Sequence, residues 1–186
     1  MMRIKKFNRF AIILGFKEVI IDDIDAFLKN IRIGMAPTLI QIFNADHIAG
    51  KKHLFFATIN ALKAFEQGRN ISDALEMETL LYASGQRQID KAIKMIGYMP
   101  TSTQLAILMI TSSQKEAEET EKKIDKFIPG IRDNSVLEIL KENKVEELGK
   151  IFKISKLELE TMAENNIDRG TILMWLIIEH NSFFYN

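Results

Sequence analysis

Apolar residues fall into three short continuous runs and several longer segments with helical periodicity. The short runs are rich in aliphatic and aromatic residues and predict β-strands over residues 9–16, 39–43 and 104–110. Pro37 favours an extended backbone just before the second run. The third run is apolar on both faces, which predicts a central strand covered on both sides of the sheet.

Helical periodicity accounts for most of the remaining chain. Apolar residues three or four positions apart predict helices over residues 22–31, 45–67, 71–83, 86–96 and 114–127. The helix over 45–67 has so wide an apolar arc that we expect other elements to cover it on more than one side. After the turn at Pro129 and Gly130 we expect only helices.

Shorter signals refine the helices. Ile89, Ala92, Ile93 and Ile96 have the spacing of a core-facing helix side. Serine followed three residues later by glutamate predicts capping boxes at Ser113 with Glu116, Ser135 with Glu138 and Ser155 with Glu158. The pattern as a whole predicts an α/β (α+β) fold. We expect a small, mostly antiparallel sheet packed with a multi-helix block, in a single domain over residues 1–186 with a helical C-terminal part.

Composition limits the class of protein. The chain has 186 residues, of which 47% are hydrophobic, so it can bury a substantial core. It has no cysteine, which excludes disulfides and thiolate metal sites and fits a reducing compartment. We expect a cytoplasmic protein, because no apolar run approaches the ~20 residues needed to span a bilayer and no signal peptide is recognisable. The formal net charge is zero, so any contact with nucleic acid must be small and local.

Signatures of catalysis and cofactor binding are missing from the sequence. The nine glycines form no G-x-G or phosphate-binding loop. His47 and His53 are six residues apart, so on one helix they cannot chelate a metal ion together. We therefore expect no metal, no cofactor and no enzymatic activity.

The beginning of the long helix is the first candidate site. Lys51 and Lys52 lie near the positive end of the helix dipole, where a cation is unfavourable by roughly 0.3–1 kcal/mol. Gly50 inside a helix costs about 1 kcal/mol more than alanine unless something must approach the backbone there. A phosphate would benefit from both lysines and the dipole. The alternative is an ordinary solvated lysine pair.

The helix break at Gly85 is the second candidate site. Ser84 is expected to cap the next helix, on which Arg87, Lys91 and Lys94 share one face. Arg87 and Gln88 can both donate hydrogen bonds to phosphates or bases. The alternative is a plain helix junction with a salt-bridged face.

These two segments, and the sequence between them, resemble a known family. The likeness spans residues 45–98, and its most specific part is Ser84-Gly85-Gln86-Arg87-Gln88-Ile89. The sequence resembles the TPRKB-like small accessory subunit of the KEOPS (EKC) complex, in its archaeal form. The resemblance implies a non-catalytic subunit that binds and stimulates an atypical protein kinase/ATPase. It also implies a role in threonylcarbamoyladenosine modification of tRNA and, for archaeal members, binding of the single-stranded CCA end.

The resemblance also suggests site residues. We expect RNA contacts from Lys51, Lys52, Ser84, Gly85, Arg87 and Gln88. Phe56 and Tyr82 are candidates for stacking on bases. Exposed apolar residues of the helix over 71–83, Met77 and Leu81, are expected to contact the kinase.

Two other functions are open at this point. Residues 145–155 and the helix expected over 156–165 have the spacing of a helix-turn-helix DNA-binding regulator, although Glu158, Glu160 and Glu164 oppose a contact with phosphates. A cofactor-dependent enzyme with a pocket around Trp175 is the third reading. The run Ile172-Leu173-Met174-Trp175 departs from the family, where a basic residue is expected, and the apolar ending over 183–185 has no assigned role.

Overall fold

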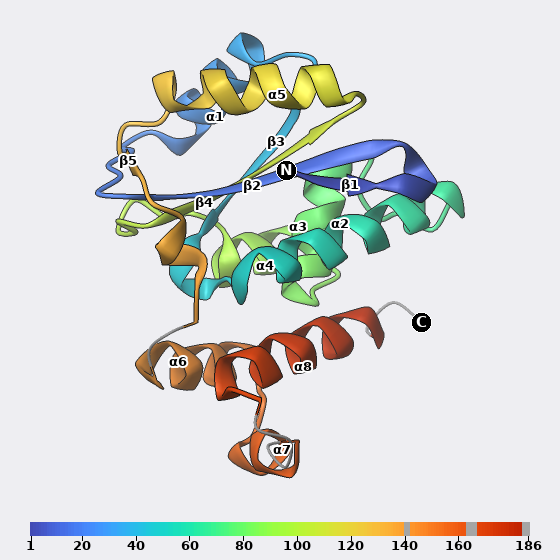
Figure 1. Cartoon of the computed structure of the whole chain (residues 1–186), viewed down its shortest axis with the longest axis vertical. Coiled ribbons are helices and arrows are strands. Elements are labelled where there is room, and N and C mark those ends of the chain that lie inside the picture. Colours follow the sequence, from blue (N-terminus) through green and yellow to red (C-terminus); the bar gives the residue numbers. More distant parts are fainter. Residues whose placement is uncertain (140–141, 163–166, 184–186) are drawn as a thin grey trace.

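A computed structural model describes residues 1–139, 142–162 and 167–183, and shows an antiparallel sheet between layers of helices (Figure 1). The strand order is β1-β2-β4-β3, with β5 paired to the end of β2. The bounds of the strands are β1 Met2–Ile4, β2 Arg9–Lys17, β3 Leu39–Asn44, β4 Leu105–Thr111 and β5 Ile131–Arg132. The three predicted strands are therefore confirmed, as is the α+β class, and two very short strands were missed.

Strand β4 is the centre of the sheet and is buried along its whole length, as predicted. It pairs with β2 on one side and with β3 on the other. Alternate residues of the strands supply two cores. Ile12 and Ile107 point to the core beneath α1 (Ile24–Gly34) and α5 (Gln114–Lys123), whereas Ala11 and Leu108 point to the core beneath the other helices.

The larger core holds the helices that lie on the opposite side of the sheet from α1 and α5 (Figure 1). These are α2 Gly50–Glu66, α3 Leu75–Ser84, α4 Ile89–Ile96, α6 Glu142–Phe152, α7 Lys156–Thr161 and α8 Arg169–Phe183. Helix α2 lies between the sheet and α8 and also packs on α3, which confirms that it is covered on more than one side. Within the described residues, no helix is long and apolar enough to cross a membrane.

Short 3₁₀ turns connect several of these elements, and one of them corrects a predicted helix. They are η1 Lys5–Phe7, η2 Ala45–His47, η3 Ile124–Lys126 and η4 Asn134–Leu137. The predicted helix over 45–67 was wrong at its start, because η2 ends at His47 and α2 begins only at Gly50. Gly50 has a φ of +85°, so it stands at the turn into α2 and not in a helix interior.

The predicted capping boxes have three different outcomes. The box of Ser155 and Glu158 is confirmed at the start of α7. Ser113 caps α5, but the Glu116 carboxylate accepts from the backbone N–H of Ser112 instead of returning to Ser113. The box at Ser135 was wrong, because Asp133 accepts the Ser135 N–H and caps η4.

Helix α4 is only half covered. Ala92 and Ile96 are fully buried, as predicted. Ile89 and Ile93, expected in the core, are 37% and 38% exposed. The periodicity identified the apolar side of α4 correctly. Because α4 packs mainly on α3, the part of that side formed by Ile89 and Ile93 is exposed to solvent.

One buried imidazole joins α2, α3 and α8. His53 is 1% exposed, and its Nδ1 accepts the backbone N–H of Ala49 at 3.2 Å. Its Nε2 must therefore carry the proton, which it donates to the carbonyl of Ala83 at 2.8 Å. Asn181 of α8 donates to the same carbonyl at 2.8 Å. We call this set of contacts the Ala83 junction.

The imidazole of His53 should make stability fall in mild acid. Burial lowers the pKa of His53 from 6.5 to about 4. Between these two values protons bind preferentially to the unfolded chain, so the free energy of unfolding decreases as pH falls through this window. The contribution of His53 to the loss should reach about 2 kcal/mol at about pH 5. Urea unfolding at about pH 7 and about pH 5 measures it.

His53→Gln is expected to be less stable near pH 7 but to lack this part of the pH dependence. The matched control is His180→Gln, which removes a half-exposed histidine of α8 and should leave the dependence intact. If wild type and His53→Gln lost equal stability over the same window, the buried neutral imidazole would not be its cause.

Candidate functional site

The Ala83 junction brings the two candidate segments of the sequence together. Lys51 and Lys52 immediately precede His53 on α2, and Arg87 follows Ala83 by four residues in the loop before α4. All three side chains are exposed. The His53–Ala83 hydrogen bond therefore links the segment that carries the two lysines to the segment that carries Arg87.

Phe56 of α2, the helix that carries the lysines, and Tyr82 of α3, near Arg87, line one small crevice. This crevice has a volume of only about 10 Å³. Burial raises the pKa of Tyr82, with Glu78 adding to the increase, while the charges of Arg69 and Arg87 oppose it. Arg87 is thus within electrostatic reach of Tyr82, and Tyr82 faces the same crevice as Phe56 of α2.

Ser84 and Gly85 are structural members of the second segment. Ser84 is 2% exposed and donates its hydroxyl to the carbonyl of Leu81, so the prediction that it caps α4 was wrong. Gly85 ends α3 in the left-handed region, with a φ of +62°. A Cβ on Gly85 would lie 2.5 Å from Oδ1 of Asn181. Both residues are expected RNA contacts that the structure instead places in packing, where they position Arg87 and Gln88.

Arg87 and Gln88 are the accessible part of the same segment. Both side chains are exposed, and Gln88 is the N-cap residue immediately before α4. No side-chain cap is formed there, so the Gln88 amide is not used by its own helix. This half of the segment is available for a ligand.

Lys51 and Lys52 border an open groove of about 460 Å³ at the start of α2. The groove is lined by residues of η4, α2 and α8, namely Ala49, Gly50, Lys51, Lys52, Asn134, Leu137, Glu138, Ile139, Asp168, Gly170, Thr171 and Met174. The ammonium of Lys52 lies 5.3 Å from the centre of the Trp175 ring. Sequence reasoning linked Trp175 only with a hypothetical cofactor pocket and missed its pairing with Lys52.

The other predicted aromatic and apolar contacts are less accessible than expected. Tyr82 is only 8% exposed, and Phe56 is half-buried against Trp175. Leu81 is fully buried, so the expectation of an exposed kinase contact at this residue was wrong. Met77 is half-buried, with Nε2 of Gln41 3.9 Å from its sulfur. These side chains are less exposed than predicted because α3 packs against both α2 and α4, which cover two faces of the helix.

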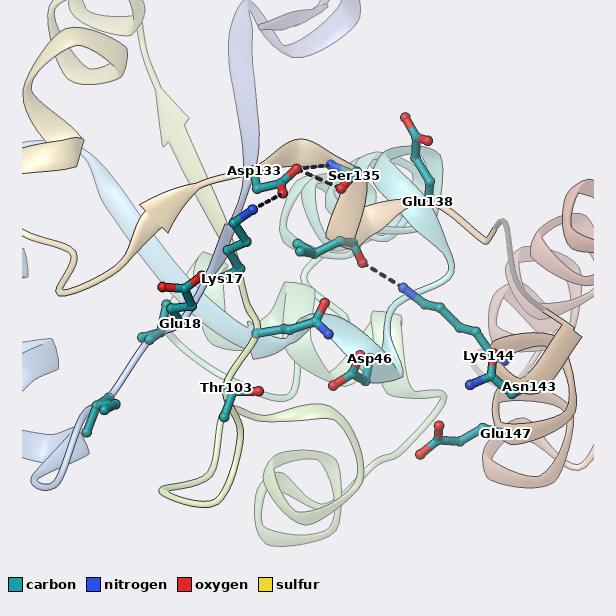
Figure 2. Close-up of a pocket in the computed structure, with 14 residues that line it drawn as sticks. Lys17, Glu18, Asp46, Thr103, Asp133, Ser135, Glu138, Asn143, Lys144 and Glu147 are labelled. Atoms are coloured by element: carbon teal, nitrogen blue, oxygen red, sulfur yellow. Dashed lines mark hydrogen bonds and ion pairs between the residues drawn. The ribbon is translucent and has the colours of Figure 1, made fainter.

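A larger cavity, which shares Glu138 with the open groove, lies where the ends of β2 and β4 meet η2, η4 and α6 (Figure 2). It has a volume of about 810 Å³. Its charged residues are two lysines and five carboxylates, Lys17, Lys144, Glu18, Asp46, Asp133, Glu138 and Glu147. We call it the acidic groove, because its formal charge is unfavourable for a phosphate.

The strongest polar contacts of the acidic groove are internal. Lys17 pairs with Asp133 at 3.1 Å, and hydrogen bonds from Ser135, followed by the contact with Lys17, lower the pKa of Asp133 to about 2. Lys144 donates to the carbonyls of Ala45 and Val136 at 3.0 and 2.7 Å, as Figure 2 shows for the second bond. Burial lowers the pKa of Lys144. The Lys17–Asp133 pair joins β2 to the start of η4, and Lys144 joins α6 to η2 and η4, so these charges hold the walls of the groove together.

The helix-turn-helix reading gains nothing from the structure. Helices α6 and α7 do follow one another, but α7 has only six residues and carries Glu158 and Glu160 against Lys156. Glu158 is committed to the capping box with Ser155. Residues 163–165 of the expected recognition helix lie outside the described residues, as do residues 184 and 185 of the apolar ending.

Comparisons with known proteins agree with the geometry. The sequence matches a family model described as kinase binding protein CGI-121 over residues 21–174. It is 41% identical over 114 residues to the regulatory protein Cgi121 of Methanocaldococcus jannaschii, covering 61% of this chain and 70% of that protein. It is 45% identical over 56 residues to the KEOPS complex subunit Cgi121 of Pyrococcus abyssi, covering 29% and 33% of the two chains. The family match includes every predicted contact residue at the Ala83 junction, and this chain belongs to the CGI-121 family of kinase binding proteins.

Proposed function

We propose that this protein is a non-catalytic subunit of a KEOPS complex, which binds and stimulates the atypical protein kinase/ATPase and recruits tRNA through its CCA end. In this role it supports threonylcarbamoyladenosine modification of tRNA without carrying out the reaction. Kinase binding follows from the family, and the name of the Pyrococcus relative supports assembly into KEOPS. Recruitment of tRNA rests on the resemblance in residues 45–98 and on the cations at the Ala83 junction.

The observation that supports the RNA proposal most strongly is the His53–Ala83 hydrogen bond, which links the segment with exposed Lys51 and Lys52 to the segment with exposed Arg87. The chain has no net positive charge, so a contact with phosphates depends on local clustering. The acidic groove would repel a phosphate backbone, whereas the exposed cations beside α2 and α3 would attract one.

Removal of the CCA end should weaken tRNA binding more than removal of any other part of the tRNA. Single-stranded ends present unstacked bases, which suits a small contact better than a duplex does. We expect tRNA lacking its terminal CCA to bind at least about tenfold more weakly than intact tRNA, the loss that one or two stacked bases would cause. A gel-shift titration with both tRNAs measures the difference. Equal affinities would exclude recruitment through the CCA end.

Arg87 tests whether the exposed half of the second segment contacts phosphate. Arg87→Glu should weaken tRNA binding and reduce the slope of log affinity against log salt by about 0.7, the value for one phosphate contact on a single strand. Lys122→Glu is the matched control, because Lys122 is exposed on α5, across the sheet. It changes the net charge equally and should leave affinity and slope close to those of wild type. An unchanged slope for Arg87→Glu would move the phosphate site elsewhere.

The kinase contact on α3 can now be tested at Met77 alone, since Leu81 is buried. If the kinase docks there, Met77→Ala should weaken its binding about fivefold to tenfold, the loss expected for one apolar contact near the centre of an interface. Binding is measured by calorimetry with purified kinase, after urea unfolding has shown that the variant is stable. Ile93→Ala on α4 is the control. The opposite pattern, with loss only for Ile93→Ala, would place the kinase on α4.

A further inference from the structure

Trp175 is the only tryptophan of the chain and is unusually exposed for its position. It lies within α8 between Met174 and Leu176, which are 9% and 7% exposed. Trp175 itself is 39% exposed. A large aromatic ring that stands in solvent beside buried neighbours is available for a contact from outside.

The ring of Trp175 is held in place by α2. The ring of Phe56 packs against it, with centroids 5.6 Å apart and an interplanar angle of 59°. Phe56 in turn contacts Phe55, whose ring is 5.8 Å away. Because this support fixes the indole before any ligand arrives, little side-chain freedom is lost when a flat group stacks on it.

A cation already lies beside the indole. The ammonium of Lys52 is 5.3 Å from the ring centre, and Lys51 is the preceding residue. A cation–π contact at an exposed site is weaker than the stacking of a nucleobase on an aromatic ring. A base can therefore displace the ammonium from the ring, and Lys52 is then free to pair with a neighbouring phosphate.

The open groove at the start of α2 is where the rest of a single-stranded RNA end would lie. Lys51, Lys52 and Met174 line it, and Lys52 links it to Trp175, whose ring lies 5.3 Å from the Lys52 ammonium. Gly50 takes a φ of +85° at the turn into α2, and an added Cβ there would just touch the carbonyl oxygen of Leu137 at 3.5 Å. Of the two carboxylates in the groove, Asp168 is engaged by the backbone and hydroxyl of Thr171, while Glu138 is exposed.

We propose that Trp175 is the stacking residue for one base of a single-stranded RNA end and that Lys52 binds the phosphate beside that base. This inference rests on the proposed RNA function and adds the residue that contacts the base. Trp175 replaces Phe56 and Tyr82, the stacking candidates named from the sequence. Phe56 packs against the indole, and Tyr82 is almost fully buried. A duplex would not bind in this way, since its bases are already stacked.

The lone tryptophan allows binding and stacking to be measured separately in one titration. The probe is a short, end-labelled RNA oligonucleotide that terminates in CCA. Its fluorescence anisotropy reports binding, and the emission of Trp175 reports stacking. We expect quenching of Trp175 with the same midpoint as the anisotropy change, and no quenching when the oligonucleotide is annealed to its complement.

Variants of Trp175 test the stacking role through the affinity of the protein for the oligonucleotide. Trp175→Ala should weaken oligonucleotide binding about tenfold, the cost of one lost stacking contact, while Trp175→Phe should retain most of it. Phe7→Ala is the matched control, because Lys6 lies 4.9 Å from the Phe7 ring and forms a similar cation–aromatic pair at the β1–β2 connection. It should bind as wild type does.

The outcomes separate this inference from the proposed function. If wild type bound the oligonucleotide without quenching and Trp175→Ala kept full affinity, the stacking role would be wrong while RNA binding stood. If wild type did not bind the oligonucleotide at all, the RNA function and this inference would both be wrong. Should Trp175→Ala prove unstable, the quenching of wild type and the affinity of Trp175→Phe decide the question.

Discussion

The carbonyl oxygen of Ala83 is the point on which the arrangement of the site depends. It accepts one hydrogen bond from α2, through His53, and one from α8, through Asn181. Both donors are buried, and loss of the His53 imidazole would leave the Ala49 N–H without its acceptor. Because the Nδ1 of His53 is occupied by the Ala49 N–H, the imidazole is held in a single neutral form. Three helices from distant parts of the sequence thereby meet in a fixed geometry at the candidate interface.

Charge is divided between two regions of a molecule that has no net charge. The acidic groove collects carboxylates near the sheet, and its two lysines are occupied by Asp133 and by backbone carbonyls. The cations beside the Ala83 junction are exposed. Such a division lets a neutral protein attract a nucleic acid to one region and repel it from another, so that orientation comes from electrostatics as well as from shape.

Local patterns predicted the elements well and the surfaces poorly. The three long strands, the central position of β4 and the double coverage of α2 follow from periodicity, since burial imposes it directly. Strands β1 and β5 have three and two residues, too few for any alternation to be recognised. The exposure of Leu81 was predicted wrongly because α2 and α4 cover both faces of α3. Trp175 was missed because its partner Lys52 is distant in sequence, and no local pattern records such a contact.

The segment Ser84-Gly85-Gln86-Arg87-Gln88-Ile89 combines two roles within six residues. Its first half is determined by packing, since Ser84 is buried and only glycine fits both the φ at position 85 and the space beside Asn181. Its second half is exposed and has hydrogen-bond donors to offer. The first half sets the direction in which the chain leaves α3, and so it decides where Arg87 can reach. The fold therefore determines the first half of this short sequence and leaves the second half open to solvent.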